Sequence, residues 1–371
     1  MNRPAAAAVP PAGPHKAAPP PIRLLIVDDS AVARAVLSRM VTSQRGFEIA
    51  ATAANAAEAI EALKRVRVDI VLLDVEMPGR TGLEALPEIL RLGRGARVLV
   101  VSSQCEAGAE AVVKALAMGA ADTLPKPGTE NFAGRFASVL AERLRKIGRN
   151  EAADAPLFRA ASPAEAALPP LREVEPYRLG CLAIAASTGG LHAIGAFLEK
   201  LPPRIGAPIL VTQHLPALFM PFFACQVAAA SGRTARVAEE GMELRADHIL
   251  IAPGDAHLSL EQQGSRVRVR LDTAPAASGC LPSADVMLGA VADVFGRSGL
   301  GVVLTGMGRD GLAGGRSLAA RGGVLLAQDK GSSAVWGMPG AIAGAGLASR
   351  IASPAELAGF VAERARRPAW S

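Results

Sequence analysis

Residues 22–44 read IRLLIVDDSAVARAVLSRMVTSQ, and this stretch contains both kinds of element that the chain repeats. A nearly continuous apolar run, 22–27, is followed by two aspartates and then by a segment whose apolar residues recur at helical spacing. Apolar runs without alternation are typical of strands buried on both faces, as in parallel sheets covered by helices. The stretch therefore predicts a strand followed by a helix, which is the repeating unit of a parallel α/β fold.

The same alternation of apolar runs and helical segments continues to residue 146. The further strand candidates are FEIAATA, VDIVLLDVEMP, ARVLVVSS and ADTLPKP. The stretches between them, such as AAEAIEALKRV, have helical periodicity. We therefore expect a flavodoxin-like (βα)5 domain over residues 22–146.

A second α/β block covers residues 177–368. Its strand candidates are GCLAIAAS, APILVTQH, HILIAPG, GLGVVLTG and GGVLLAQD. Residues 257–271, HLSLEQQGSRVRVRL, alternate apolar and polar residues on both sides of a glycine, which predicts an antiparallel hairpin. The block therefore predicts a doubly wound, mainly parallel α/β domain that carries a hairpin.

Two segments lack these patterns. Residues 1–21 are rich in alanine and proline, and we expect a disordered tail there. Residues 147–176 combine alanine, proline and charge without a sustained strand pattern, so we interpret them as a linker between the domains.

Composition bounds the classes of function. The formal net charge of +6 is modest for 371 residues, and arginine is spread along the chain, so nucleic-acid binding is not expected. Because the four cysteines (Cys105, Cys181, Cys225 and Cys280) lie far apart, we expect neither a disulfide framework nor a thiolate zinc site, and we predict a cytoplasmic location. No apolar run reaches the roughly 20 residues that cross a bilayer, so we expect no direct membrane insertion.

Charged residues gather at the predicted strand ends of the first block. Asp28 and Asp29 follow the first strand, Asp74 ends DIVLLD, and Lys126 follows the last strand. Because the carboxyl ends of parallel strands meet at one edge of a sheet, these side chains can converge. Three carboxylates together call for a cation, and Mg²⁺ prefers such oxygen ligands.

These residues belong to motifs that resemble those of response-regulator receiver domains: LIVDDS, LLDVEMPGRTGLEAL, VVSS and MGAADTLPKP. The resemblance implies that Asp74 is the phosphoacceptor and that Lys126 contacts the phosphoryl group. It also implies that Ser102, or its neighbour Ser103, is the switch hydroxyl. The Mg²⁺ ligands that it implies are Asp28, Asp29, Asp74 and the backbone carbonyl of Glu76.

In the second block, IAASTGG (184–190) ends an apolar run at Ser187 and continues into a helical segment. A serine there can cap the helix, because its side chain accepts a hydrogen bond from the first amides. It can instead be a nucleophile at a sharp strand-to-helix turn. The spacing of phosphate-binding loops is absent, so a phosphate cradle is disfavoured.

A nucleophilic serine needs a base. His214 ends ILVTQH, at the carboxyl end of a predicted strand and therefore at the same sheet edge as Ser187. His192 lies inside the following helical segment, His248 begins a strand, and His257 begins the hairpin, where it could be structural or line the cleft. We therefore predict that His214 is the base.

The base needs a carboxylate that orients it. Asp310 follows a predicted strand in the glycine-rich loop of VVLTGMGRDG, and it is our candidate over Asp255 and Asp285. The resulting order is serine, histidine, aspartate. It differs from the order of α/β-hydrolases, in which the acid precedes the histidine.

Six motifs of this block resemble the catalytic domain of chemotaxis response-regulator protein-glutamate methylesterases, the CheB family: IAASTGG, VTQHLPALF, IAPGDAHL, PSADVML, VVLTGMGRDG and AVWGMPGA. The resemblance implies that Ser187 is the nucleophile, that His214 is the general base and acid, and that Asp310 orients His214. Thr188 and Met307 lie beside the site, and a backbone N–H of either is a candidate donor to the oxyanion.

The resemblance implies a phosphorylation-activated hydrolase. Its substrates would be glutamate methyl esters, and selected glutamines, on methyl-accepting chemotaxis receptors. A chemotaxis histidine kinase would supply the phosphoryl group. Mg²⁺ would bind the receiver, and the esterase site would use no cofactor. The unphosphorylated receiver would cover the active site.

Overall fold

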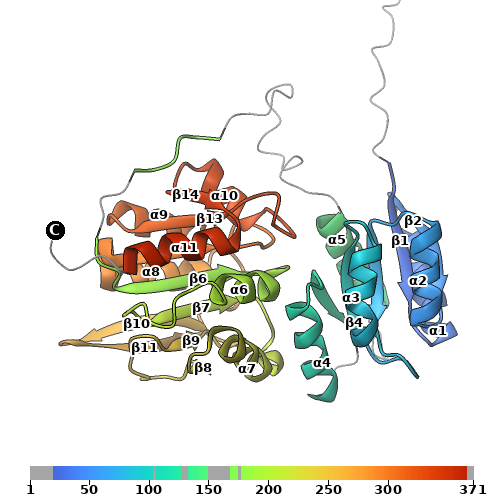
Figure 1. Ribbon diagram of the computed structural model, residues 1–371, viewed down its shortest axis with the longest axis horizontal. Helices are drawn as coiled ribbons and strands as arrows, with labels where there is room; N and C mark the ends of the chain where they lie inside the picture. The colour runs from blue at the N-terminus through green and yellow to red at the C-terminus, as the bar shows by residue number, and fades with distance from the viewer. Residues whose placement is uncertain (1–19, 103–105, 127–132, 149–167, 174–176, 366–371) are drawn as a thin grey trace, which may run out of the picture.

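The computed structural model describes residues 20–102, 106–126, 133–148, 168–173 and 177–365. Figure 1 shows two α/β domains side by side, one ending with α5 and the other beginning with β6. Nearly all of the predicted tail, 1–21, and most of the predicted linker, 147–176, lie outside the described residues.

The first domain is built on a five-stranded parallel sheet in the order β2-β1-β3-β4-β5, which confirms the flavodoxin-like prediction. Helices α1 and α5 pack on one face, and α2, α3 and α4 pack on the other. The strands are β1 (Ile22–Val27), β2 (Phe47–Ala53), β3 (Ile70–Asp74), β4 (Arg97–Ser102) and β5 (Asp122–Pro125). The helices are α1 (Ala31–Thr42), α2 (Ala56–Arg65), α3 (Gly82–Leu92), α4 (Glu106–Ala117) and α5 (Ala133–Gly148).

Local signals explain where the first helices begin. Ser30, Asn55 and Thr81 each accept a hydrogen bond from the backbone N–H three residues further on, so each caps a helix. The central strand β3 is buried along its whole length, as its apolar sequence predicts. The aspartates at the strand ends are therefore held between a buried strand and a capped helix.

The second domain is built on a seven-stranded parallel sheet in the order β14-β13-β12-β6-β7-β9-β8, with a separate antiparallel hairpin, β10–β11. The strands are β6 (Cys181–Ala186), β7 (Ile209–Gln213), β8 (Ala235–Val237), β9 (Ile249–Ile251), β10 (His257–Gln263), β11 (Arg266–Asp272), β12 (Gly299–Val303), β13 (Val324–Gln328) and β14 (Arg350–Ala352). The helices are α6 (Gly190–Leu198), α7 (Met220–Ser231), α8 (Ala284–Phe295), α9 (Leu312–Ala320), α10 (Met338–Gly344) and α11 (Pro354–Ala365), with 3-10 turns at Ala217–Phe219 and Gly296–Ser298. The predicted fold class and hairpin are confirmed.

Strand β6 is the point at which the chain order of this sheet reverses. It pairs with β7 along one edge and with β12 along the other. In open α/β sheets, sites form outside the carboxyl ends of the strands at such a switch point. Ser187 directly follows β6, so the topology alone places it there.

The sequence analysis did not predict the two edge strands of this sheet, β8 and β14. Each has three residues, and neither is fully buried. A run this short leaves no hydrophobic pattern that separates a strand from a loop.

The end of the predicted linker contacts the second domain. The amide of Arg172 donates to the carbonyl of Ala348 (2.8 Å). Its guanidinium donates to the carbonyls of Gly323 (2.7 Å) and Ala319 (2.8 Å). These carbonyls precede β13 and β14, so Arg172 is held at the amino-terminal edge of the sheet, opposite Ser187.

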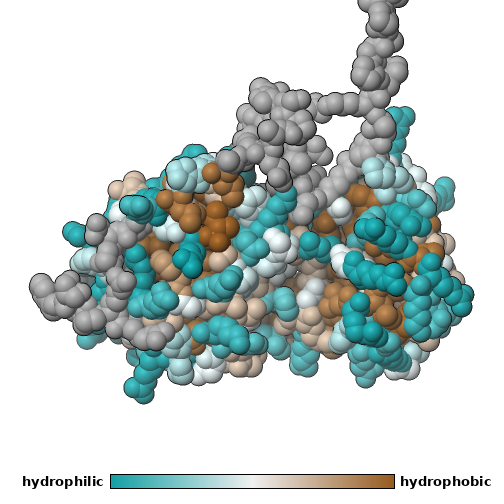
Figure 2. Space-filling view, turned by 45° about the horizontal axis from the view of Figure 1, so that its top comes forward, coloured by the Kyte–Doolittle hydropathy of each residue, from teal (hydrophilic) through white to brown (hydrophobic). Residues whose placement is uncertain are grey.

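The two domains touch through α4, which packs against α6 and α7 (Figure 1). A cleft of about 450 Å³ lies between them, and Leu83, Ala117, Met118, Leu191 and Phe223 are among its lining residues. Figure 2 shows polar residues over much of the face that it presents, with hydrophobic residues in separate patches. Among the described helices, none is both long enough and apolar enough to cross a membrane.

Two glycines of α6 should respond differently to substitution by alanine, because their surroundings differ. A Cβ at Gly190 would lie 2.1 Å from Gln213 Oε1 and 2.7 Å from Ala186 Cβ, whereas a Cβ at Gly195 meets nothing within 4 Å. We expect Gly190→Ala to lower the free energy of unfolding by about 1–3 kcal/mol, because the added methyl overfills a packed site.

The matched control is Gly195→Ala on the same helix. It should raise the free energy of unfolding by up to about 1 kcal/mol, because alanine favours a helix interior over glycine. Urea denaturation of both variants checks the pair. Equal stability of the two variants would contradict the close packing of α6 on β6 and β7.

Candidate active site and phosphoacceptor pocket

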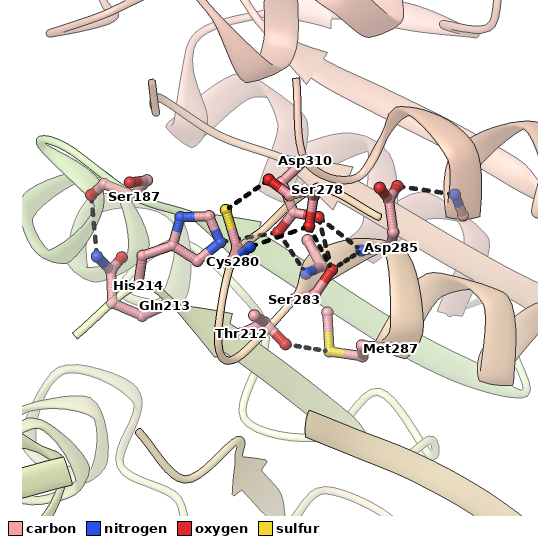
Figure 3. Close-up of polar contacts among 12 residues, drawn as sticks. Ser187, Thr212, Gln213, His214, Ser278, Cys280, Ser283, Asp285, Met287 and Asp310 are labelled. Carbon is pink, nitrogen blue, oxygen red and sulfur yellow. Dashed lines mark hydrogen bonds and ion pairs between the residues drawn. The ribbon is translucent and has the colours of Figure 1, made fainter. Parts of the chain in front are cut away.

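The three predicted catalytic residues lie at the carboxyl edge of the second sheet, each in the loop that follows a strand. His214 Nε2 lies 2.8 Å from Asp310 Oδ2. Figure 3 shows the His214 ring between Ser187 on one side and Cys280 with Asp310 on the other. Because Nε2 faces Asp310, the ring nitrogen turned toward Ser187 is Nδ1. The arrangement is that of a nucleophile, a base and an orienting acid.

Asp310 is buried, and the start of α8 holds its carboxylate. Ser283 Oγ donates to Oδ1 (2.7 Å), and the amide of Ala284 donates to Oδ2 (2.6 Å). Burial raises the pKa of Asp310, but the hydrogen bonds from His214 and from the start of α8 outweigh burial and hold the pKa well below its usual range. Asp310 is therefore ionised at neutral pH and can stabilise a positive charge on His214.

Cys280 completes the surroundings of His214. The ligand atoms of His214, Cys280 and Asp310 all lie within 4.8 Å of one another. Burial lowers the pKa of His214, but hydrogen bonds with Asp310 and Cys280 outweigh burial and raise the pKa to about 9. In this conformation the imidazole is therefore mostly protonated at neutral pH.

The backbone around Ser187 is tightly packed. Its N–H donates to the carbonyl of Thr305 (3.0 Å), and its carbonyl accepts from Gln213 Nε2 (2.9 Å). A Cβ at Gly306 would lie 2.9 Å from Ser187 Cβ and 2.4 Å from Met338 Sδ, so this position requires glycine. These contacts fix the turn that presents the serine.

The N-cap interpretation of Ser187 is wrong. Helix α6 begins at Gly190, and its N-cap is Gly189, which has a φ of 75° and makes no side-chain cap. Glycine adopts this left-handed conformation without strain. The hydroxyl of Ser187 therefore does not cap α6.

The two candidate oxyanion donors lie in the loops beside Ser187. The carbonyl of Thr188 accepts from Thr305 Oγ1 (2.9 Å), which fixes the peptide after the serine. Within the part of the chain that the structure describes, neither the amide of Thr188 nor that of Met307 has a backbone acceptor. Both N–H groups thus stay candidates for the oxyanion.

The receiver touches this same turn. The amide of Gly189 donates to the carbonyl of Ala121 (2.6 Å), just before β5. Thr188 Oγ1 lies 3.5 Å from Asp122 Oδ2, and His192 Nδ1 lies 3.1 Å from the carbonyl of Ala117. Part of the interdomain contact therefore falls on the residues that immediately follow Ser187.

The other histidines lie away from Ser187 or have structural partners. His248 precedes β9, at the opposite edge of the sheet. His257 is buried, with Nδ1 accepting from the amide of Ser283 (2.9 Å) and Nε2 lying 2.9 Å from the carbonyl of Ala274. Of the rival acids, Asp285 lies in the first turn of α8 and accepts from the amide of Gly314 (2.9 Å).

Sequence reasoning did not predict Gln213, Cys280 or Ser283 as parts of the site. Ser283 had a signal, because a serine directly before a helical segment is a typical N-cap, and Ser283 caps α8. Gln213 had a weaker signal, because it precedes His214 at the carboxyl end of the same strand. Cys280 had none, since a loop residue is brought to His214 only by packing.

In the receiver, Asp28, Asp29 and Asp74 place ligand oxygens within 4.8 Å of one another. Lys126 Nζ lies 2.6 Å from Asp74 Oδ2 and 3.1 Å from Asp28 Oδ2. Burial raises the pKa of Asp74, an effect that outweighs its hydrogen bonds to Lys126 and to the amide of Glu76. An all-oxygen cluster with excess negative charge is typical of a Mg²⁺ site, and these residues fit that ion.

The remaining receiver residues are placed as follows. Ser102 is buried at the end of β4, and its carbonyl accepts from the amide of Lys126 (2.8 Å). The amide of Glu76 donates to Asp74 Oδ1 (3.1 Å). Ser103, the other candidate for the switch hydroxyl, lies outside the described residues.

Comparison with known proteins matches both domains. Residues 182–361 match the CheB methylesterase family, and residues 24–132 match the response regulator receiver domain. A solved structure, the CheB methylesterase catalytic domain of Thermotoga maritima, is 32% identical, covers 50% of this chain and 98% of its own, and gives a TM-score of 0.49.

Two curated relatives match almost the whole chain. A protein-glutamate methylesterase/protein-glutamine glutaminase of Caulobacter vibrioides is 39% identical over 348 residues, which is 93% of this chain and 99% of that protein. Another, from Paramagnetospirillum magneticum, is 37% identical over 368 residues, which is 93% of this chain and 97% of that protein. The chain therefore belongs to the CheB methylesterase family, with a receiver domain before its methylesterase domain.

Proposed function

We propose that this protein hydrolyses glutamate methyl esters on methyl-accepting chemotaxis receptors, releasing methanol, and that the same site deamidates receptor glutamines. The observation that carries the proposal is the His214–Asp310 pair at 2.8 Å, with the other face of the imidazole turned toward Ser187 at the sheet switch point. The names of the curated relatives supply the substrate class.

In the proposed mechanism, His214 transfers the proton, and Asp310 stabilises the charge that forms on it. Once deprotonated at Nδ1, His214 accepts the Ser187 proton while the hydroxyl oxygen attacks the ester carbonyl. Asp310 stabilises the resulting imidazolium through Nε2–H, and the amides of Thr188 or Met307 donate to the oxyanion. The ring nitrogens are used in the opposite sense from chymotrypsin-type triads, in which the acid binds Nδ1.

His214 then acts as an acid to complete the first half of the reaction and as a base again in the second half. His214 returns the proton to the leaving methanol, and Ser187 is left as a glutamyl ester. Water, deprotonated by His214, then hydrolyses this acyl-enzyme. Each turnover adds one negative charge to the receptor.

The proposal includes control by the receiver. The backbone around Ala121 and Asp122 contacts the turn after Ser187, and Lys126, at the end of the same strand β5, binds Asp74. A phosphoryl group on Asp74 adds negative charge and draws Lys126 and Ser102 to new partners, which shifts β5 and loosens the contact. A chemotaxis histidine kinase in the cytoplasm is the proposed phosphodonor, and Asp28, Asp29, Asp74 and the Glu76 carbonyl would hold the Mg²⁺.

The nucleophile is tested with Ser187→Ala. Methanol release from methylated receptor membranes should fall at least about 10³-fold, because the covalent route is lost. Ser317→Ala, which removes an exposed hydroxyl on α9, is the matched control and should leave the rate unchanged. Release from Ser187→Ala at the rate of the control would refute the assignment.

The pH dependence follows from the raised pKa of His214. The imidazole cannot accept the Ser187 proton while it is protonated, so kcat/KM of the unphosphorylated protein should rise with pH and level off above about 9. Cys280→Ala should move the midpoint to lower pH, because one of the groups that raise the pKa is removed. Cys225→Ala, at an exposed cysteine, should leave the midpoint in place. A midpoint near the ordinary histidine value in all three proteins would contradict the role of Cys280.

Receiver control is tested with Asp74→Asn. A small phosphodonor such as acetyl phosphate should stimulate methanol release by the wild type severalfold and leave this variant unstimulated. In a second variant, Ala117→Arg, a bulky cation in the interdomain cleft should raise the unstimulated rate toward the phosphorylated one. Val32→Arg, on the exposed face of α1, is its control. Unchanged activity of Ala117→Arg would contradict the proposal that the unphosphorylated receiver covers the active site.

A further inference from the structure

The loop between β11 and α8 brings a cysteine to the catalytic pair. The Sγ of Cys280, a ring nitrogen of His214 and a carboxylate oxygen of Asp310 all lie within 4.8 Å of one another (Figure 3). The three residues come from separate loops, so their spacing in the sequence resembles no known metal motif. In the proposed ester hydrolysis Cys280 is not the nucleophile, the base or the orienting acid, so its position beside His214 is open to a second role.

The three atoms are the types that bind zinc. Zn²⁺ takes cysteine sulfur at about 2.3 Å and histidine nitrogen or carboxylate oxygen at about 2.0–2.2 Å, in tetrahedral geometry. Two such ligands lie roughly 3.3 Å apart around one ion. The 2.8 Å between His214 Nε2 and Asp310 Oδ2 would therefore open by only about half an ångström.

The surroundings also suit a metal site. Ser283 and Ala284 hold the Asp310 carboxylate from behind, as outer hydrogen-bond partners commonly hold metal-binding carboxylates. Asp310 is buried, whereas His214 and Cys280 are both partly exposed, so an ion has a path from solvent.

We propose that His214, Cys280 and Asp310 form a binding site for Zn²⁺ or a similar borderline-soft divalent ion, and that the ion inhibits the esterase. The ion replaces the proton shared by His214 Nε2 and Asp310. Binding also releases the Cys280 thiol proton to solvent, and it leaves a fourth position for water.

The inhibitory part of the inference rests on the proposed function. With an ion on Nε2, the neutral imidazole carries its one remaining proton on Nδ1, so Nδ1 has no free lone pair. His214 then becomes a poor acceptor for the Ser187 proton.

Ligand softness separates this site from the receiver cluster. Asp28, Asp29 and Asp74 offer oxygen only, which suits Mg²⁺, whereas a thiolate with an imidazole suits zinc. Elsewhere among the described cysteines, Cys181 is fully buried, and burial raises its thiol pKa. Cys225 is exposed on α7 and provides a control.

Binding is tested with Co²⁺ on the full chain in the presence of excess Mg²⁺. We expect one equivalent of Co²⁺ to produce the thiolate-to-cobalt charge-transfer absorption that oxygen ligands cannot give. Cys280→Ala should abolish the band, and Cys225→Ala should retain it. Absence of the band in the wild type, or its persistence in Cys280→Ala, would overturn the site.

Inhibition is tested with Zn²⁺ on methanol release. Zinc should suppress the wild-type rate, and a chelator should restore it. Relative to its own metal-free rate, Cys280→Ala should need at least about tenfold more zinc. An active enzyme with the cobalt band but no zinc inhibition would refute the inhibitory role. A metal-free wild type that releases no methanol would instead refute the proposed function, and the cobalt result would still decide the site.

Discussion

The hydrogen bond between His214 and Asp310 determines how the rest of the site is used. It commits Nε2 to the acid, so Nδ1 is left for Ser187. The start of α8 also approaches the carboxyl edge of β7. There the Ser283 hydroxyl donates to Oδ1 of Asp310, and the Ala284 amide donates to Oδ2, the oxygen that faces His214. The buried His257 in turn accepts from the amide of Ser283, so the hairpin supports the same network.

Much of this arrangement follows from the sequence. Apolar runs mark the buried parallel strands, and residues at the carboxyl ends of such strands meet at one edge of the sheet. This rule predicts that His214 and Asp310 lie close together. The rule fails where the pattern is short or the approach depends on packing. β8 and β14 have three residues each, and Cys280 reaches His214 through the path of a loop.

The contact between the domains also depends on packing and could not be predicted from the sequence. One of its hydrogen bonds joins the Gly189 amide to the Ala121 carbonyl, and no sequence pattern marks such backbone groups. The first-turn glycines of α6 show the same limit. Their sequence predicts a tight turn, but only the structure shows that Gly189 serves as the N-cap in a left-handed conformation and that Ser187 does not.

The attachment of Arg172 has a mechanical consequence. Its hydrogen bonds fix the end of the connecting segment at the amino-terminal edge of the second sheet, across the domain from Ser187. The chain therefore joins the second domain at a point remote from Ser187. Because both domains belong to one chain, the effective concentration of the receiver near α6 is high, and even a weak interaction suffices for the contact between them.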